Sequence, residues 1–492
     1  MNIPHTELFD LIKSLSASEK RYFKLYAIAI SGRETASYMK LFNFIDKMND
    51  YDEALIKKKF KNERFIKQLS VLKNYLLNLI IKGLLHSREE THTSSHLQLQ
   101  VATIQLLFEK GLHGLCLKTI KRLKEAAQLQ EDFSMIDKLC DWEIRILMCD
   151  LQTTKAIEKT DEQINALKKR LIDLEIKREA LGLLKTSYET KTNIANNKLL
   201  KAAEKFEKKT RIQQEHGGIL GRYFHHAALN VAFGTLKDND KRFYHATIAM
   251  RQIEQNESFL EANLRLYISL MYNYSNALFS TKEFDLLQEF LEEKSKIIES
   301  LNDNLHKELK LMGNVILSNV KILLFLNGYY SVLPSNIVSV SKKNIQESRH
   351  YSDGFYIAEL SINLIHALFL EKQFNEALYF VNEILNHKRY KFIQLIYTQT
   401  RLWELILHHE LNNVFLLKNL CESTIRFLNK EKKLMPFDLK MINYLKTDDI
   451  EKKETLKEEL LKELNKNKEN KAVFSLLQDN IDYQRWLTEK KH

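Results

Sequence analysis

Proline is almost absent from this chain, and its absence limits the possible folds more than any other feature. No proline occurs between Pro4 and Pro334, and the 492 residues contain 3 prolines and 12 glycines. Average usage would be about 5% proline and about 7% glycine. The turns of sheets recruit these residues for a fixed φ or for φ > 0, whereas helices joined by short polar loops do not need them. The sequence therefore predicts an all-α fold.

The length predicts more than one hydrophobic core. Single cores stop growing at about 250–300 residues, so 492 residues are expected to form several domains or one elongated array. The cysteines form no CxxC pair, which indicates free thiols in a reducing compartment. The N-terminus lacks the regions of a signal peptide, and the least charged stretch, Ile322 to Ser341, is too polar for a membrane span. We expect a cytoplasmic protein that does not bind membranes.

Residues 1–90 are predicted to form an N-terminal helical bundle. Ser16 and Glu19 have the spacing of a capping box, in which each residue bonds the backbone N–H of the other. Asp52 can cap a short fourth helix, and a fifth helix is expected to begin at Phe65, where an apolar stripe of helical period starts.

Beyond this bundle, two boundaries follow from composition. The polar segment from Ser87 to His96 is predicted to be a linker, and a helical array then occupies residues 97–430. Residues 431–492 combine a Glu- and Lys-rich helix with a second apolar cluster. Repeat arrays need terminal units with one polar face, so we expect this tail to consist of capping helices.

Helical hairpins recur through residues 97–430. The clearest spans Ile362 to Leu385, where Phe374 opens the second helix and Ala377 lies where the two helices touch. Similar entries into a second helix occur at Leu112, Phe243, Phe284, Tyr330 and Phe415.

These hairpins resemble the tetratricopeptide-repeat superfamily of α-solenoids, in a variety with long helices. The resemblance implies an α-α superhelix with a concave face that binds a protein or peptide. The segments SASEKRYFKLY and DYQRWL also resemble a group of bacterial helical-repeat proteins, a resemblance that implies no activity.

The concave face would be lined by the first helix of each hairpin. Aligning the hairpins on Phe284 and Phe374 predicts a peptide groove whose polar side chains come from Tyr272, Asn273, Asn276, Asn363 and His366. Amides in such a groove can bind a peptide backbone through paired donors and acceptors. The alternative is that these side chains bond neighbouring helices to one another.

A heptad pattern extends over residues 157–181. The two seam positions are apolar, with Ile157, Ile164 and Leu171 at one and Leu167, Leu174 and Leu181 at the other. A seam of this period keeps facing a neighbouring helix. Two interpretations follow: the seam packs on the next, basic helix, Lys191 to Arg211, or it forms a homodimer contact.

A basic run lies in the N-terminal unit. The formal net charge of +11 arises mostly from mixed-sign surface, but one segment has a single acid, Glu63, against six basic residues: Lys57, Lys58, Lys59, Lys61, Arg64 and Lys67. Two short helices that meet at a basic turn are similar to helix-turn-helix readers of DNA, and phosphate contacts would give salt-dependent affinity. The alternatives are a solvated surface and a site for an acidic protein.

Signals for catalysis and for metal or cofactor binding are missing. Gly217, Gly218 and Gly221 lack the spacing and the preceding strand of a nucleotide-binding loop, and we interpret them as a helix break. His92 and His96 could bind a metal only on a rigid helix, which the surrounding threonines and serines make unfavourable. Adjacent histidines point to different faces of a helix and so cannot chelate, which applies to the pairs His225–His226 and His408–His409.

These observations predict a non-catalytic scaffold without a cofactor or metal, which binds a protein or peptide on the concave face of its repeats. An alternative is a regulator-like protein that binds nucleic acid through its basic N-terminal unit and uses the repeats as a sensor. A third hypothesis is a helical enzyme whose catalytic residues form no recognisable sequence motif.

Overall fold

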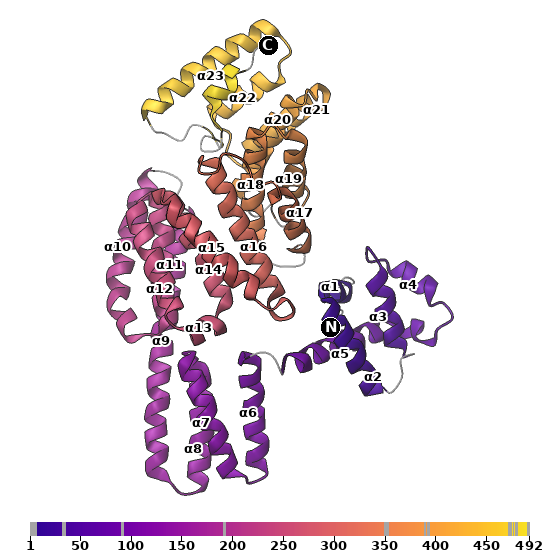
Figure 1. Cartoon of the computed structure of the whole chain (residues 1–492), viewed down its shortest axis with the longest axis vertical. Coiled ribbons are helices and arrows are strands. Elements are labelled where there is room, and N and C mark those ends of the chain that lie inside the picture. Colours follow the sequence, from indigo (N-terminus) through magenta and orange to yellow (C-terminus); the bar gives the residue numbers. More distant parts are fainter. Residues whose placement is uncertain are drawn as a thin grey trace. The chain divides into compact units, whose positions relative to one another are not determined.

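The computed structural model describes residues 7–31, 36–89, 93–189, 193–348, 354–387, 390, 394–470, 475, 477 and 481–489. Within these residues the regular structure is helical, with α-helices α1 to α24, one 3-10 helix and no strand (Figure 1). The prediction of an all-α fold is confirmed for this part of the chain. The chain divides into two compact units, Met1–Glu283 with Ser300–Lys310, and Phe284–Glu299 with Leu311–His492.

The first unit begins with the helices of the N-terminal residues 7–89. In chain order they are α1 (Glu7–Ser14), α2 (Ala17–Ser31), α3 (Ser37–Lys47), α4 (Glu53–Lys59), the 3-10 helix η1 (Arg64–Gln68) and α5 (Leu69–Glu89). The capping box is confirmed, since the Ser16 N–H donates to Glu19 Oε2 at 2.8 Å and the Glu19 N–H donates to Ser16 Oγ at 3.2 Å. Asp52 caps α4 by accepting from two backbone N–H groups. The prediction of an α-helix from Phe65 was wrong by one turn, because that turn is 3-10.

The remaining complete α-helices of the first unit follow in chain order. They are α6 (Thr93–Glu109), α7 (His113–Leu129), α8 (Phe133–Cys149), α9 (Thr153–Glu189), α10 (Asn193–His216), α11 (Ile219–Leu236), α12 (Asn239–Glu254), α13 (Glu257–Ala262) and α14 (Leu264–Thr281). The predicted linker from Ser87 to His96 is mostly helical: α5 extends to Glu89 and α6 starts at Thr93, while residues 90–92 lie outside the described part. Polar composition was misleading there, because helix ends also contain many polar residues.

The second unit contains most of α15 (Phe284–Ser300) and α16 (Asp303–Leu326). Its other helices are α17 (Ile337–Ser348), α18 (Gly354–Leu370), α19 (Phe374–Asn386), α20 (Gln394–Glu410), α21 (Val414–Lys430), α22 (Pro436–Lys446), α23 (Ile450–Asn470) and α24 (Tyr483–Glu489). From α17 to α24 each helix that has a described neighbour packs on the next one or two along the chain.

One turn joins many successive helices. A residue with left-handed φ follows the helix, and the next N–H bonds a carbonyl five residues back, as in a Schellman motif. The left-handed residues are Gly111, Glu131, Leu151, Lys237, Lys282, Gly328, Lys372, Asn412 and Lys432. Seven of these nine are not glycine, so the chain makes tight helical turns with few glycines.

This turn explains which predicted hairpin entries were right. Phe284 and Phe374 are the first residues of α15 and α19, two positions after the left-handed residue. Leu112 is the N-cap of α7. Phe243 was wrong as an entry, since it lies inside α12, and Tyr330 was wrong because it precedes α17 in a non-helical turn.

Buried apolar side chains form separate clusters along the chain. One cluster includes residues of α1–α5, a second residues of α6–α9, a third residues of α9–α11, and another extends from α16 to α24. Helix α9 contributes Ala166 to the second cluster and Ala180 to the third. It therefore connects two cores, as its length allows (Figure 1).

One described helix segment, His306–Leu326, is apolar and long enough to cross a membrane by length and composition alone. However, 72% of its apolar window is buried within the protein. The helix has the properties of a core helix, and the cytoplasmic location stays a prediction.

Candidate functional site

Helix α9 buries one face against its neighbours. Ala166, Ile176, Ala180 and Leu183 are buried, and the helix packs on α8, α10 and α11. Polar contacts to α10 flank this face: Lys209 Nζ lies 3.0 Å from Glu179 Oε1, and Gln213 Nε2 donates to Glu175 Oε2 at 3.0 Å. The intramolecular partners of α9 thus lie on one face.

The opposite face is the α9 seam, formed by the six heptad residues of the sequence prediction. These side chains are 41–64% exposed: Ile157, Ile164, Leu167, Leu171, Leu174 and Leu181. The interpretation in which the seam packs on the following helix is wrong, because α10 contacts other residues of α9. Contiguous exposed apolar surface of this kind marks interaction sites. Tyr188, one heptad beyond Leu181, continues the seam and is 73% exposed.

The basic run is a surface patch. Each of its six side chains is exposed: Lys57, Lys58, Lys59, Lys61, Arg64 and Lys67. Lys57 pairs with Glu53 at 2.8 Å, and Glu63, the acid within the run, pairs instead with Lys40 at 2.6 Å. The patch lies on α4, the following turn and η1, so its scaffold is a seven-residue helix and a 3-10 turn.

The predicted groove residues belong to two different units. Tyr272, Asn273 and Asn276 lie on α14 and are partly buried. Asn363 lies on α18, where its Nδ2 donates to Asn319 Oδ1 on α16 at 2.9 Å. His366, also on α18, has its ring 5.9 Å from that of Trp403. The hydrogen bond of Asn363 joins α18 to α16. It agrees with the alternative to a peptide groove, in which these side chains bond neighbouring helices to one another.

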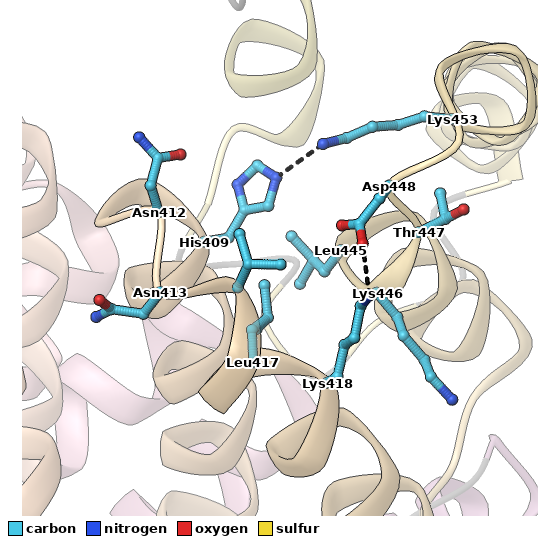
Figure 2. Close-up of a pocket in the computed structure, with 11 residues that line it drawn as sticks. His409, Asn412, Asn413, Leu417, Lys418, Leu445, Lys446, Thr447, Asp448 and Lys453 are labelled. Carbon is cyan, nitrogen blue, oxygen red and sulfur yellow. Dashed lines mark hydrogen bonds and ion pairs between the residues drawn. The ribbon is translucent and has the colours of Figure 1, made fainter.

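A small pocket lies between α20, α21, α22 and the start of α23 (Figure 2). Figure 2 shows Lys418 paired with Asp448 and Lys453 next to His409, with Nζ–Nε2 at 3.3 Å. Its volume of about 70 Å³ is below the roughly 300–1,000 Å³ of typical ligand sites. The pocket therefore suits water or a small ion better than an organic substrate.

Gly217 and Gly218 form the break between α10 and α11, as predicted, whereas Gly221 lies in the first turn of α11. Gly218 and Gly221 also enclose a carboxylate. Asp173 of α9 accepts from the Gly218 N–H at 2.8 Å. A Cβ at Gly218 would lie 2.9 Å from Asp173 Oδ2, and a Cβ at Gly221 would overlap Asp173 Oδ1. Burial raises the pKa of Asp173. This carboxylate satisfies N–H groups at the start of α11, a structural role that the spacing of the glycines did not predict.

Three histidines meet in a buried cluster that the sequence prediction missed. His225 and His226 lie on α11 and His245 on α12, and they are 2%, 6% and 3% exposed. One ring nitrogen of each lies within 4.8 Å of the corresponding nitrogens of the other two. We call these residues the histidine cluster. The adjacent pair does point to different helix faces, but both faces are buried and His245 comes from the neighbouring helix.

Hydrogen bonds and aromatic rings position the histidine cluster. The Nδ1 atoms of His226 and His245 lie 2.9 Å apart, so one donates to the other. His225 Nδ1 lies 2.7 Å from the hydroxyl of Thr210 on α10. Phe206 stacks on His225, and Phe233 stacks on His245.

Burial keeps these rings neutral. The pKa of His225 and of His245 is lowered to about 4, and that of His226 to about 3, mainly because burial disfavours the charged imidazole. Neutral imidazole is the form that binds metal ions. The His92–His96 pair, which the sequence analysis judged unfavourable for a metal, cannot be compared with this cluster because His92 lies outside the described residues.

Comparison with protein-family models, with curated proteins and with solved structures finds no match to this chain. The class of protein that the fold itself defines is an all-α protein of successive packed helices. The tetratricopeptide-like resemblance stays a prediction.

Proposed function

We propose that this chain is a non-catalytic helical scaffold that acts by binding protein, and that the α9 seam is a principal contact surface. The proposal rests on one observation: α9 packs on its own chain through one face and exposes an apolar heptad stripe on the other. Exposing large apolar side chains at regular spacing has a free-energy cost in water. A partner helix that covers them would remove it.

The partner that best fits the seam is α9 of a second copy. Its β-branched residues, Ile157 and Ile164, share one seam position, and leucines fill the other. Isoleucine at the first position with leucine at the second favours two parallel strands. In that arrangement Arg170, beside the seam, would face the partner's Glu175, which has the opposite charge. Arg178 occupies a seam position itself, and it limits the dimer's stability.

The expected affinity is modest. Fully burying a leucine or isoleucine contributes about 1.5–3 kcal/mol, so covering a half-exposed one contributes about 1 kcal/mol. Twelve such side chains in a dimer contribute about 12 kcal/mol against an association cost of about 4–15 kcal/mol. We therefore expect a dissociation constant in the micromolar range or weaker.

Sedimentation equilibrium of the full chain from 1 to 100 micromolar, taken as an order-of-magnitude range, tests this proposal. Leu171→Glu is expected to shift the curve to monomer, because it places a charge in the seam. The control is Asn165→Glu, which adds the same charge at an exposed position of α9 outside the seam. A wild-type chain that stays monomeric throughout, or equal dimerisation of both variants, would contradict the proposal.

Tetratricopeptide-like stacking of the hairpins within each unit is part of the same proposal. The recurring left-handed turn supports it, as does the packing of successive helices from α6 to α14 and from α17 to α24. The groove at Tyr272, Asn273, Asn276, Asn363 and His366 remains a hypothesis for a peptide site, of which the Asn363–Asn319 bond supports the structural alternative.

Binding of nucleic acid is a second candidate function, favoured by the exposure of all six side chains of the basic patch. Retention of the full chain on a nucleic-acid column at low salt, with elution as salt rises, is the expected behaviour. Combined replacement of Lys57, Lys58 and Lys59 by glutamate should abolish it. The matched control replaces three exposed lysines of α10: Lys201, Lys205 and Lys208. No retention of wild type at low salt would exclude this function.

A further inference from the structure

We infer that the histidine cluster is a binding site for a divalent transition-metal ion such as Zn²⁺, with His225, His226 and His245 as its ligands. The inference is independent of the proposed scaffold function. It rests on the convergence of three imidazole rings, two from α11 and one from α12, which pack on one another.

The geometry matches what an imidazole site needs. One nitrogen from each ring lies within 4.8 Å of the others, and zinc held by nitrogens about 2.0–2.1 Å away brings such atoms to within about 3.5 Å of one another. Small side-chain rotations therefore suffice to close the site. The ligands come from α11 and α12, which pack directly on one another, so the site needs no mobile loop.

The hydrogen bonds of His225 orient it for metal binding. The hydroxyl of Thr210 donates to the Phe206 carbonyl at 2.7 Å, so its oxygen is left to accept from His225 Nδ1–H. The Nε2 atom of this neutral ring then carries the lone pair. Histidine ligands of metals commonly donate their other N–H in this way, which fixes the tautomer. Thr210 would be an orienting residue rather than a ligand.

His226 and His245 supply the other two nitrogens. Their Nδ1 atoms share one hydrogen across 2.9 Å. A bound cation would take the place of that hydrogen, and the proton would move from Nδ1 to Nε2 of the ring that had donated it. Imidazole ligands suit zinc, copper and nickel rather than magnesium or calcium. Three protein ligands also leave one tetrahedral position for water or another group.

The alternative is a purely structural histidine cluster. Buried polar groups must be hydrogen-bonded, and the three rings could serve only to join α10, α11 and α12. Arg222 and Lys241 lie near enough to disfavour charge on the imidazoles, and they would oppose a cation as well. Stoichiometric metal binding therefore distinguishes the two roles.

Equilibrium dialysis of the tag-free full chain against Zn²⁺, and titration with Co²⁺ followed by its visible absorption, test the inference. We expect one ion per chain. His226→Asn and His245→Asn should each weaken binding by about 100-fold or more, since loss even of an outer-shell partner costs about 10–100-fold. The control is His366→Asn, which removes a largely buried histidine from the second unit and should leave binding unchanged.

Two results would overturn the inference: a wild-type chain that binds no stoichiometric ion, or folded cluster variants that bind like wild type. If the variants do not fold, X-ray absorption of the Zn²⁺-loaded wild-type chain decides the question. Three imidazole ligands per zinc support the site, and a shell dominated by water, carboxylate or sulfur refutes it.

Discussion

Replacing Gly221 by alanine should destabilise the first unit, although alanine is the better helix former. Gly221 lies in the first turn of α11, and its added Cβ would overlap Oδ1 of Asp173. The same Cβ would lie 3.2 Å from Cδ1 of Ile176, and the Asp173 side chain is itself buried, so neither group has much room to move. Displacing Asp173 breaks its bond to the Gly218 N–H.

The magnitude follows from two opposing contributions. Alanine in place of a helical glycine contributes about 0.5–1 kcal/mol of stability. A hydrogen bond to a charged group contributes about 1.5–3 kcal/mol, and its loss leaves a buried carboxylate without that partner. The net expectation for Gly221→Ala is a loss of about 1–2 kcal/mol of unfolding free energy.

Gly182→Ala provides the matched comparison. Gly182 also lies inside a helix, α9, but a Cβ there would meet nothing within 4 Å. This variant should gain about 0.5–1 kcal/mol. Thermal unfolding followed by circular dichroism should show midpoints on opposite sides of wild type, since about 1 kcal/mol shifts the midpoint by about 2–4 °C in a domain of this size. The reasoning is refuted if Gly221→Ala is as stable as Gly182→Ala.

Two further predictions concern a turn and a buried histidine. Lys372 has φ of 57°, so Lys372→Gly should raise the unfolding free energy of the second unit by about 0.5–1 kcal/mol in urea titration, while Glu371→Gly, next to it in the turn, should lower it. The pKa of His366 is lowered to about 4 by burial, whereas the unfolded chain has the ordinary value near 6.5. The unfolded state therefore binds more protons between these values, and stability falls as pH drops from about 6.5 to about 4, by about 2 kcal/mol at pH 5. Urea midpoints at pH 7 and pH 5 should differ less for His366→Asn than for wild type. Equal differences would contradict the conclusion that protonation of His366 lowers the stability.

Much of the local structure could be predicted from the sequence. The capping box at Ser16 and Glu19, the cap at Asp52 and the helix starts at Phe284 and Phe374 all follow from neighbours within a few residues. The heptad pattern of α9 was equally visible. The exposure of this stripe could not be predicted, because a heptad pattern indicates an apolar helix face but does not indicate which helix packs on it.

The candidate metal site shows the limit of such reasoning. The divergence of adjacent residues on a helix argues against chelation by the pair His225–His226, and no local pattern connects the pair with His245, which lies on the next helix. The available cue was a third histidine, His245, on the helix that directly follows the pair.

The sequence by itself determined that this chain is helical, where many of its helices begin, and that α9 carries a heptad stripe. These properties depend on backbone propensity, capping and periodicity, which act over a few residues. Tertiary structure alone decided that the α9 seam faces solvent, that Gly218 and Gly221 enclose Asp173, and that three histidines converge. Burial and side-chain contact depend on which helices pack together, and that choice is made by residues far apart in the chain.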